Sequence, residues 1–291
     1  MKISRGDFLK TSLGIAGLAL LHAPSLKAAA KAASSKSDVA MLVDVSKCIG
    51  CWWCYAACKN YNNLTETIKP DPEQAPELSP ETWTTLYTLK TNDDWSFRKQ
   101  ACMHCTDAAC VKVCPSGALS YNDLGFVQYD KDKCIGCGYC AEFCPFEVPK
   151  LKDDKITGVG LMAKCTFCKD RVTNGQQPAC AEACPTGAIK FGNRSELLEE
   201  GKQRVMELSK SNPKTRLYGE YELDGLHILS VLPDQPSVYG LPEEPQLPAT
   251  ATIQKDIFRP LTWIVWGAVA AGLALNVLVA RAMQLRKKEE D

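Results

Sequence analysis

The chain has 291 residues, of which 23% are charged and 45% hydrophobic, so its composition is that of a folded protein rather than a disordered one. Its 34 lysines and arginines balance its 34 aspartates and glutamates, which argues against a nucleic-acid-binding protein. Cysteine is the outlier, because 16 cysteines accompany only 3 histidines. These cysteines are clumped along the chain, which indicates a fold that uses thiols for a specific chemistry.

Residues 1–33 have the layout of an export signal. Lys2 and Arg5 precede an apolar run that is too short to span a bilayer, and alanines follow it. The string over 4–10 resembles a twin-arginine signal, except that Gly6 occupies the place of the second arginine. Export together with a partner that carries a complete signal is therefore an alternative to independent export. A simple amphipathic N-terminus is the other interpretation.

The sixteen cysteines fall into four groups of four. The first and third groups have spacings of x2, x2 and x3, the second has x2, x4 and x3, and the fourth has x2, x11 and x3. Proline follows the last cysteine in every group except the first, where Lys59 follows it. The groups are Cys48, Cys51, Cys54 and Cys58; Cys102, Cys105, Cys110 and Cys114; Cys134, Cys137, Cys140 and Cys144; and Cys165, Cys168, Cys180 and Cys184.

This spacing is typical of ferredoxins that bind [4Fe–4S] clusters. Three cysteines in one tight loop can reach three irons of a cubane. The fourth is expected to begin a helix that leads to a neighbouring cluster, and the proline after it suits the first turn of such a helix. Four motifs therefore predict four [4Fe–4S] clusters, with iron as the metal and no cysteine left over.

Three other uses of cysteine fit the pattern less well. Disulfide bonds between cysteines two residues apart have poor geometry, and zinc sites generally use pairs of cysteines separated by longer loops. Covalently attached haem requires a histidine directly after a Cys-x-x-Cys pair, but Tyr55, Thr106 and Lys169 occupy those positions.

The spacing also predicts which cysteines share a cluster. The second and third groups are 19 residues apart, as in a compact two-cluster ferredoxin, which leaves the first group to pair with the fourth. Within a pair, each group gives three cysteines to one cluster and its last cysteine to the other. The expected sets are Cys48, Cys51, Cys54 and Cys184 (cluster 1); Cys165, Cys168, Cys180 and Cys58 (cluster 2); Cys102, Cys105, Cys110 and Cys144 (cluster 3); and Cys134, Cys137, Cys140 and Cys114 (cluster 4).

Short strands flank these motifs and repeat along the chain. Strands are expected over 39–44 and 126–130, before the first and third groups, and over 117–121 and 187–191, after the second and fourth. The predicted fold class is α+β, with two ferredoxin-like units of two clusters each over residues 38–192. In each unit the cubanes replace part of an apolar core that is otherwise too small.

Two further regions interrupt or follow this domain. An insertion over 59–101 is proline-rich at first and then predicts a strand over 83–90. Residues 193–255 predict a helix that begins at a capping box, one strand over 225–232 and a proline-rich segment. We expect this extension to contact partner subunits.

Residues 256–291 predict a single transmembrane anchor with a cytoplasmic tail. The stretch 261–280 is uncharged, and as a helix it is about 30 Å long, the thickness of a hydrocarbon core. Trp263 and Trp266 lie where an interfacial aromatic belt is expected. Basic residues are more numerous after the stretch than before it, so the C-terminus is expected in the cytoplasm and the bulk of the chain in the periplasm. A buried core helix is the alternative.

The sequence offers no catalytic site. It contains no recognisable nucleophile–base set and no phosphate-binding loop, and His104 and His227 have no evident acid–base partners. The anchor contains no histidine that could bind haem. The chain is therefore expected to transfer electrons between partners rather than to act as an enzyme with its own substrate site.

From Cys48 to Phe191 the chain resembles the four-cluster iron–sulfur (beta) subunits of the molybdopterin oxidoreductase superfamily. The resemblance is carried by the cysteine strings, such as Cys134-Ile-Gly-Cys and Cys184-Pro-Thr-Gly-Ala. In the tail, the strings 225–227, 232–236 and 239–242 resemble the beta subunit of membrane-bound formate dehydrogenase.

This resemblance implies a catalytic subunit with a molybdenum– or tungsten–pterin cofactor and a membrane cytochrome b subunit that reduces quinone in anaerobic respiration. By the same analogy, electrons enter at clusters 1 and 2 and leave through clusters 3 and 4 near the membrane. One alternative is the iron–sulfur subunit of a membrane-bound nickel–iron hydrogenase. Alternatives of another class are an iron–sulfur sensor and a structural metal-stapled module.

Overall fold

The computed structural model describes residues 38–65, 70–91, 94–152, 160–253 and 259–290. The expected export signal over 1–33 lies outside these residues. The described residues between 38 and 253 form one compact unit, and the long helix α9 belongs to a second unit and is described by itself.

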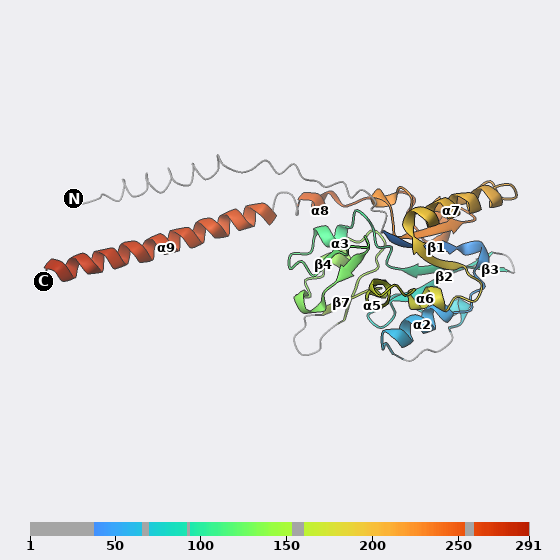
Figure 1. The fold of residues 1–291 in the computed structure, drawn as a ribbon, viewed down its shortest axis with the longest axis horizontal. Coiled ribbons are helices and arrows are strands. Elements are labelled where there is room, and N and C mark those ends of the chain that lie inside the picture. Colours follow the sequence, from blue (N-terminus) through green and yellow to red (C-terminus); the bar gives the residue numbers. More distant parts are fainter. Residues whose placement is uncertain (1–37, 66–69, 92–93, 153–159, 254–258, 291) are drawn as a thin grey trace. The chain divides into compact units, whose positions relative to one another are not determined.

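The centre of the compact unit is a four-stranded sheet in which distant segments of the chain pair. The strand order is β8 (Ile189–Asn193), β1 (Val39–Asp44), β10 (Ile228–Leu232) and β9 (Arg216–Tyr218). β1 is antiparallel to β8 and parallel to β10, and β9 is antiparallel to β10. Strands expected at 39–44 and 187–191 are thus confirmed as neighbours (Figure 1).

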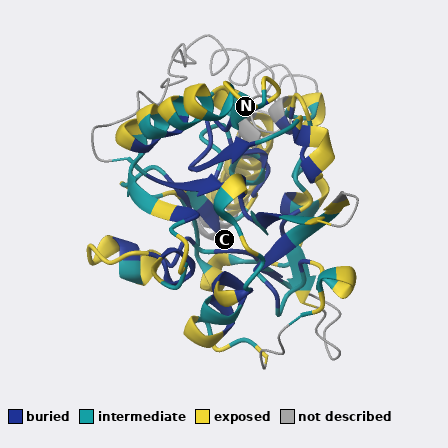
Figure 2. Ribbon diagram, turned by 90° about the vertical axis from the view of Figure 1, so that its right-hand side faces the viewer, coloured by how far each residue is buried: buried dark blue, intermediate teal, exposed yellow. Residues whose placement is uncertain are grey.

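Successive side chains of β1 point to opposite faces of this sheet. Both faces are buried, since other parts of the chain pack against each of them. Met41 packs into the largest hydrophobic cluster, whereas Leu42 packs with Leu197 of α7 (Arg194–Leu208) on the other face. Asn193 caps α7, since its Oδ1 accepts a hydrogen bond from the Ser195 amide at 2.9 Å. Figure 2 shows dark blue, buried stretches of strand in the interior of the unit.

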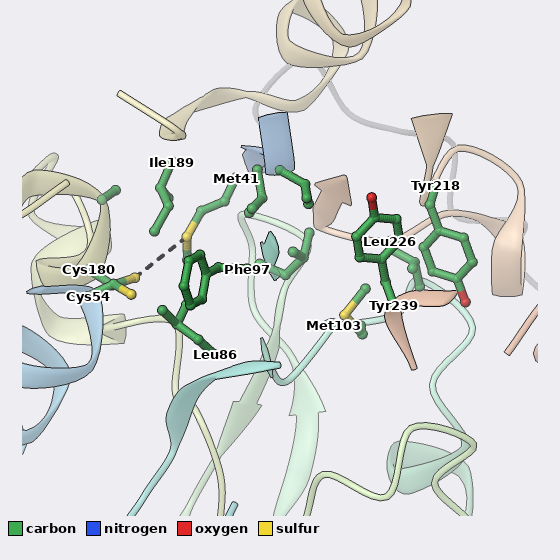
Figure 3. Packing of buried hydrophobic residues seen from close by; sticks show 14 of the residues in the cluster. Met41, Cys54, Leu86, Phe97, Met103, Cys180, Ile189, Tyr218, Leu226 and Tyr239 are labelled. Atoms are coloured by element: carbon green, nitrogen blue, oxygen red, sulfur yellow. Dashed lines mark hydrogen bonds between the residues drawn. The ribbon is translucent and has the colours of Figure 1, made fainter. Parts of the chain in front are cut away.

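The largest hydrophobic cluster joins the sheet to the cysteine loops. Figure 3 shows Met41 of β1 beside Phe97 and Leu86, with the Cys54 and Cys180 sulfurs at the edge of the same cluster. Met103, Leu226 and Tyr239 continue the cluster on the other side. The cysteine loops therefore lie against the core, where few water molecules reach them.

Three antiparallel hairpins and several short helices complete the unit. The hairpins are β2 (Thr84–Thr91) with β3 (Asp94–Ala101), β4 (Leu119–Tyr121) with β5 (Val127–Tyr129), and β6 (Lys150–Lys152) with β7 (Leu161–Ala163). The helices are α2 (Trp53–Tyr61), α3 (Ala109–Lys112), α4 (Tyr139–Glu142), α5 (Lys169–Thr173), α6 (Ala179–Glu182) and α8 (Ala249–Ile253). Single 3-10 turns are η1 (Val45–Lys47), η2 (Pro72–Gln74), η3 (Lys131–Lys133), η4 (Glu222–Asp224) and η5 (Pro236–Tyr239).

The expectation that the last cysteine of each group begins a helix is wrong. In the second, third and fourth groups the short helix contains the third cysteine and ends before the fourth, so that Cys114, Cys144 and Cys184 follow α3, α4 and α6. The proline after each of them has no amide hydrogen and disfavours helical geometry at the cysteine before it, so it begins a turn instead.

The first group departs from the others because α2 continues past its last cysteine. Cys58 lies inside α2, where a proline at the next position would interrupt the helix. Lys59 is buried there instead, and its ammonium donates to Thr65 Oγ1 at 3.0 Å and to the Glu81 carbonyl at 2.9 Å. Lys59 thus ties the insertion to the cysteine helix.

The tail is part of the same unit, although the sequence places a boundary between residues 192 and 193. β10 pairs with β1 along four residues, so the tail supplies an inner strand of the sheet. Arg98 of the insertion donates from Nε to the carbonyl of Tyr239 at 2.7 Å, which fixes the tail to β3. Residues beyond 192 therefore complete the fold that holds the cysteines.

The helix α9 (Arg259–Glu290) contains a candidate membrane span over Ile264–Met283. None of this span is buried against the rest of the protein. Among the described residues it is the one helix long and apolar enough to cross a membrane. Its length and composition, rather than any contact, support this assignment.

Substitution of Gly50 tests the tight first cysteine loop. Gly50 has φ +64°, and a Cβ there would lie 2.4 Å from Cζ of the buried Phe97. Gly117 has the similar φ of +67° but nothing within 4 Å of a Cβ. We expect Gly50→Ala to lower the free energy of unfolding by about 3 kcal/mol and Gly117→Ala by about 1 kcal/mol. Chemical denaturation of the cluster-loaded variants measures both, and equal losses would contradict the role of Phe97.

Candidate iron–sulfur cluster sites

All sixteen cysteines lie within the described residues, and none of them forms a disulfide bond. Most are buried or half-buried, and Cys137 is exposed. Among the described residues, no group of three His, Cys, Asp or Glu side chains is arranged to hold a single metal ion.

Four cysteines predicted to share cluster 1 line one cavity. They are Cys48, Cys51, Cys54 and Cys184, and Lys99 lies in the same wall. The first three come from the loop after η1 and the start of α2, and the fourth follows α6. Burial raises the pKa of the Cys48 thiol, and the thiolates of Cys51 and Cys184 raise it further.

A second cavity is lined by the four cysteines predicted for cluster 2. These are Cys58, Cys165, Cys168 and Cys180, together with Met41 and Phe167. The Cys180 thiol lies 3.8 Å from the sulfur of Met41 (Figure 3, dashed line). Because Cys54 and Cys58 are one helical turn apart, α2 brings a thiol to each of the two cavities.

The remaining eight cysteines gather in the same way around the β4–β5 hairpin. Burial raises the pKa of Cys105, and the neighbouring thiolates that add to this effect are Cys102, Cys110 and Cys144. Burial also raises the pKa of Cys140 to about 12, with contributions from Cys137, Cys114 and Cys134. The thiols that influence Cys105 and Cys140 belong to the fours predicted for clusters 3 and 4, and these ligand sets stay predictions.

Thiolates of one predicted set influence the pKa values of cysteines in the next set. Burial is the main cause of the raised pKa values of Cys54, Cys165 and Cys110, and a thiolate from the next set contributes to each. These contributions come from Cys180 on Cys54, from Cys102 on Cys165 and from Cys140 on Cys110. These contributions link set 1 with set 2, set 2 with set 3, and set 3 with set 4.

The loops of the first and third groups are built alike, which confirms the internal repeat. Asp44 and Asp130 each accept a hydrogen bond from the amide two residues later, at 3.0 and 3.1 Å, and so begin η1 and η3. Gly50 and Gly136 then have φ of +64° and +68°. A left-handed residue at this point turns the chain sharply, so that the following cysteines face the same centre.

The three lysines that precede a cysteine group have different environments. Lys47 and Lys133 are on the surface and form ion pairs with Asp44 and Asp130, at 3.7 and 2.9 Å. Lys164 is buried, and its ammonium donates to the Cys165 carbonyl at 3.0 Å. A second buried lysine, Lys99 of β3, was not singled out from the sequence. Its signal was the alternation of Phe97, Lys99 and Ala101 on one face of a strand.

The two histidines noted in the sequence are buried parts of this framework. The His104 ring lies 4.8 Å from the Phe167 ring and 6.0 Å from the Phe126 ring, measured between centroids. His227 Nδ1 lies 2.6 Å from the carbonyl oxygen of Val39. Burial lowers the pKa of both rings, and the carboxylate of Asp38 is among the charged groups that act on His227.

The donor set suits four [4Fe–4S] clusters. Each site offers four thiols, and soft thiolate sulfur is the ligand that iron–sulfur clusters take. The Lys99 ammonium is buried without a hydrogen-bond partner among the described residues, which suits a neighbouring anionic group. The cysteines of each site come from at least two separated segments, so a bound cluster also staples the fold.

Comparison with known proteins agrees with this arrangement. Residues 47–118 and 93–194 match two families, each described as a 4Fe-4S dicluster domain. The chain is 38% identical to the formate dehydrogenase iron-sulfur subunit of Haemophilus influenzae over 260 residues, which cover 84% of this chain and 81% of that one.

Two further relatives have similar roles. The nitrate-inducible formate dehydrogenase iron-sulfur subunit of Escherichia coli is 37% identical over 271 residues, which cover 88% of this chain and 90% of that one. The thiosulfate reductase electron transfer subunit of Salmonella typhi is 42% identical over 159 residues, which cover 54% of this chain and 76% of that one.

The buried thiols predict a pH-dependent stability of the iron-free chain. Burial raises the pKa of Cys58, Cys140 and Cys168 to about 12, against about 8.5 for a free thiol. Folding thus disfavours their thiolates, so this stability is present below about pH 8.5 and is lost as the pH rises towards 12.

We expect the thermal midpoint of the iron-free chain to fall steadily between about pH 8.5 and 11. The cluster-loaded protein is expected to lack this loss, because its thiolates are already bound to iron. Anaerobic thermal unfolding followed by circular dichroism compares the two forms. Parallel pH profiles would show that burial does not hold these thiols protonated.

Proposed function

Because this chain belongs to the family of formate dehydrogenase iron-sulfur subunits, we propose that it carries electrons from a formate-oxidising catalytic subunit to a membrane partner. The chain is an electron-transfer subunit with four [4Fe–4S] clusters, and it is not the catalytic subunit of its complex. When bound, each cluster takes up and releases one electron at a time. We propose that the four sets form a row in the order 1, 2, 3 and 4. This row carries the proposal, and the effect of thiolates in one set on the pKa values of cysteines in the next supports it.

We propose the ligand sets in the form that the spacing predicts. The cavity walls support clusters 1 and 2, and the mutual influence of neighbouring thiols supports clusters 3 and 4. Cysteines far apart in sequence, such as Cys48 and Cys184, then hold the same cluster. The protein's part is to fix these thiols in place and to exclude water from them.

The two ends of the row are the proposed points of entry and exit. Ile49 and Trp53 are exposed beside the cysteines of cluster 1, and Ile135 and Tyr139 are exposed beside those of cluster 4. Exposed apolar side chains at both ends suit contact with partner subunits. We place the catalytic subunit, with a molybdenum– or tungsten–pterin cofactor, at cluster 1 and a cytochrome b subunit that passes electrons to quinone at cluster 4.

This direction is supported by the path of the tail. Helix α8 packs against α3, which precedes Cys114, a proposed ligand of cluster 4. The chain continues from α8 into the segment that leads to the membrane helix. This contact brings α8, the last described helix before the proposed anchor, near the group of cysteines that contains Cys114.

We propose the following organisation along the chain. Residues 1–33 act as an export signal, 38–192 carry the clusters, with an insertion at 59–101, and 193–255 contact partner subunits. Residues 256–291 anchor the chain, with the bulk in the periplasm and the C-terminus in the cytoplasm. The exposed side chains of Met206 and Tyr221 support partner contact by the tail. The apolar span over Ile264–Met283 and the basic residues after it support the anchor and its orientation.

Paired cysteine substitutions test the ligand sets. If Cys48 and Cys184 hold the same cluster, Cys48→Ala/Cys184→Ala is expected to lose that one cluster and keep about twelve irons. Cys58→Ala/Cys184→Ala removes ligands from two clusters and is expected to keep about eight irons. Iron and acid-labile sulfide per purified chain measure the difference. The opposite ranking of the two double variants would mean that Cys184 and Cys58 are exchanged.

The function is tested with the complex extracted in mild detergent and kept anaerobic. We expect a copurifying subunit that contains molybdenum or tungsten with pterin, and we expect formate to reduce the clusters as seen by electron paramagnetic resonance. Hydrogen gas serves as the matched control, because the alternative is a nickel–iron hydrogenase subunit. Nickel in the complex, with reduction by hydrogen and not by formate, would support that alternative. A colourless protein without iron would support the alternative that the chain is a structural module.

A further inference from the structure

Two lysines are buried inside the row of cysteine sets, away from any surface ion pair. Lys99 lies on β3 and Lys164 directly after β7, and both side chains are almost completely inaccessible to solvent. A buried ammonium is strongly unfavourable unless negative charge compensates it. The groups that compensate these two ammonium charges therefore indicate what the lysines do.

Lys99 lies between the first and second cysteine sets. It lines the cavity of cluster 1, and its Nζ has no hydrogen-bond partner among the described residues. Burial by itself lowers the pKa of the Lys99 ammonium, but cysteine thiolates from both sets outweigh burial and raise it. These thiolates are Cys180, Cys165, Cys54 and Cys58.

Lys164 occupies the equivalent place between the second and third sets. Its ammonium donates to the carbonyls of Cys165 and Val127, at 3.0 and 3.4 Å. Burial lowers its pKa, and the thiolates of Cys102, Cys110 and Cys165 outweigh that effect. Apart from burial, the largest influences on both lysines come from cysteine thiolates.

The chemistry of the proposed ligand sets gives these cations a role. A [4Fe–4S] cluster with four thiolates is an anion, and reduction adds one more negative charge. A fixed positive charge nearby stabilises the reduced form more than the oxidised form, and it does so strongly where water is excluded. A buried lysine therefore raises the reduction potential of a cluster beside it.

We propose that Lys99 and Lys164 are buried counter-cations at the first two junctions of the row, and that each raises the reduction potential of the two clusters it faces. Lys99 acts on clusters 1 and 2, and Lys164 acts on clusters 2 and 3. This inference rests on the ligand sets proposed above. Both lysines are positioning residues, since they act through the clusters and bind no substrate.

Lys133 provides a matched control. It directly precedes Cys134, just as Lys164 precedes Cys165, but it is exposed and paired with Asp130. Solvent and the carboxylate screen its charge from the cluster. Its removal is therefore expected to leave all potentials unchanged.

The test is a redox titration of the complete complex, followed by electron paramagnetic resonance, after the iron content of each variant has been measured. Signals are assigned to clusters with the cysteine variants described above. At a fixed potential, Lys99→Met is expected to lower the ratio of reduced to oxidised clusters 1 and 2 about tenfold, equivalent to about 59 mV for a one-electron couple. Lys99→Arg keeps the charge and is expected to stay within about threefold of the wild type. Lys133→Met is expected to match the wild type.

The proposed role of Lys99 is overturned if a fully iron-loaded Lys99→Met complex has unchanged reduction potentials. An equal fall in the reduction potentials of all four clusters would also overturn it. If this variant loses iron, Lys99→Gln and Lys164→Met are measured by the same criteria, with Lys164→Met expected to lower clusters 2 and 3. Iron content and reduction by formate are separate readouts. If the iron-loaded variant complexes are reduced by formate but their reduction potentials do not change when either lysine is replaced, this inference is wrong and the proposed function is unaffected.

Discussion

The fold has to place sixteen cysteine thiols around four buried anionic clusters. Within each group, only short segments of chain connect the cysteines. Each site takes its cysteines from at least two segments, and α2 serves two sites because Cys54 and Cys58 are one turn apart. Because α2 serves both sites, it holds the first and last cysteine groups together. The pairing of β1 with β8 in the central sheet has the same effect. The inorganic groups then supply contacts that apolar side chains supply in other small domains.

Charge is the second consequence of this arrangement. The chain is neutral overall, with 34 basic and 34 acidic residues, but its charges are unevenly distributed between surface and interior. Acidic partners neutralise Lys47 and Lys133 at the surface, whereas Lys99 and Lys164 are buried among thiols. Low solvent access strengthens the interaction between these cations and the sites, so two residues can influence three of the four proposed clusters.

Sequence reasoning succeeded where spacing constrains geometry and failed where it does not. The flanking strands were predicted because their alternation and their position before and after each motif are local features. The sequence analysis expected short helices to begin at Cys114, Cys144 and Cys184, but the helices end just before these residues. A proline at the next position is compatible both with the start of a helix and with a turn that follows a helix. β3 and the inner position of β10 went unrecognised, since strand pairing depends on partners far away in the chain.

The sequence by itself determined the kind of cofactor, the number of sites and the apolar C-terminal helix, because each follows from short-range spacing or from local composition. Tertiary structure alone decided that Cys102 of the second group lies near enough to Cys165 of the fourth group to raise its pKa. It also decided that Lys99, far from any motif, lies between two sets while Lys133, adjacent to a cysteine, faces water. Both depend on which distant strands pack together, and a hydrophobic core specifies that only when the whole chain has folded.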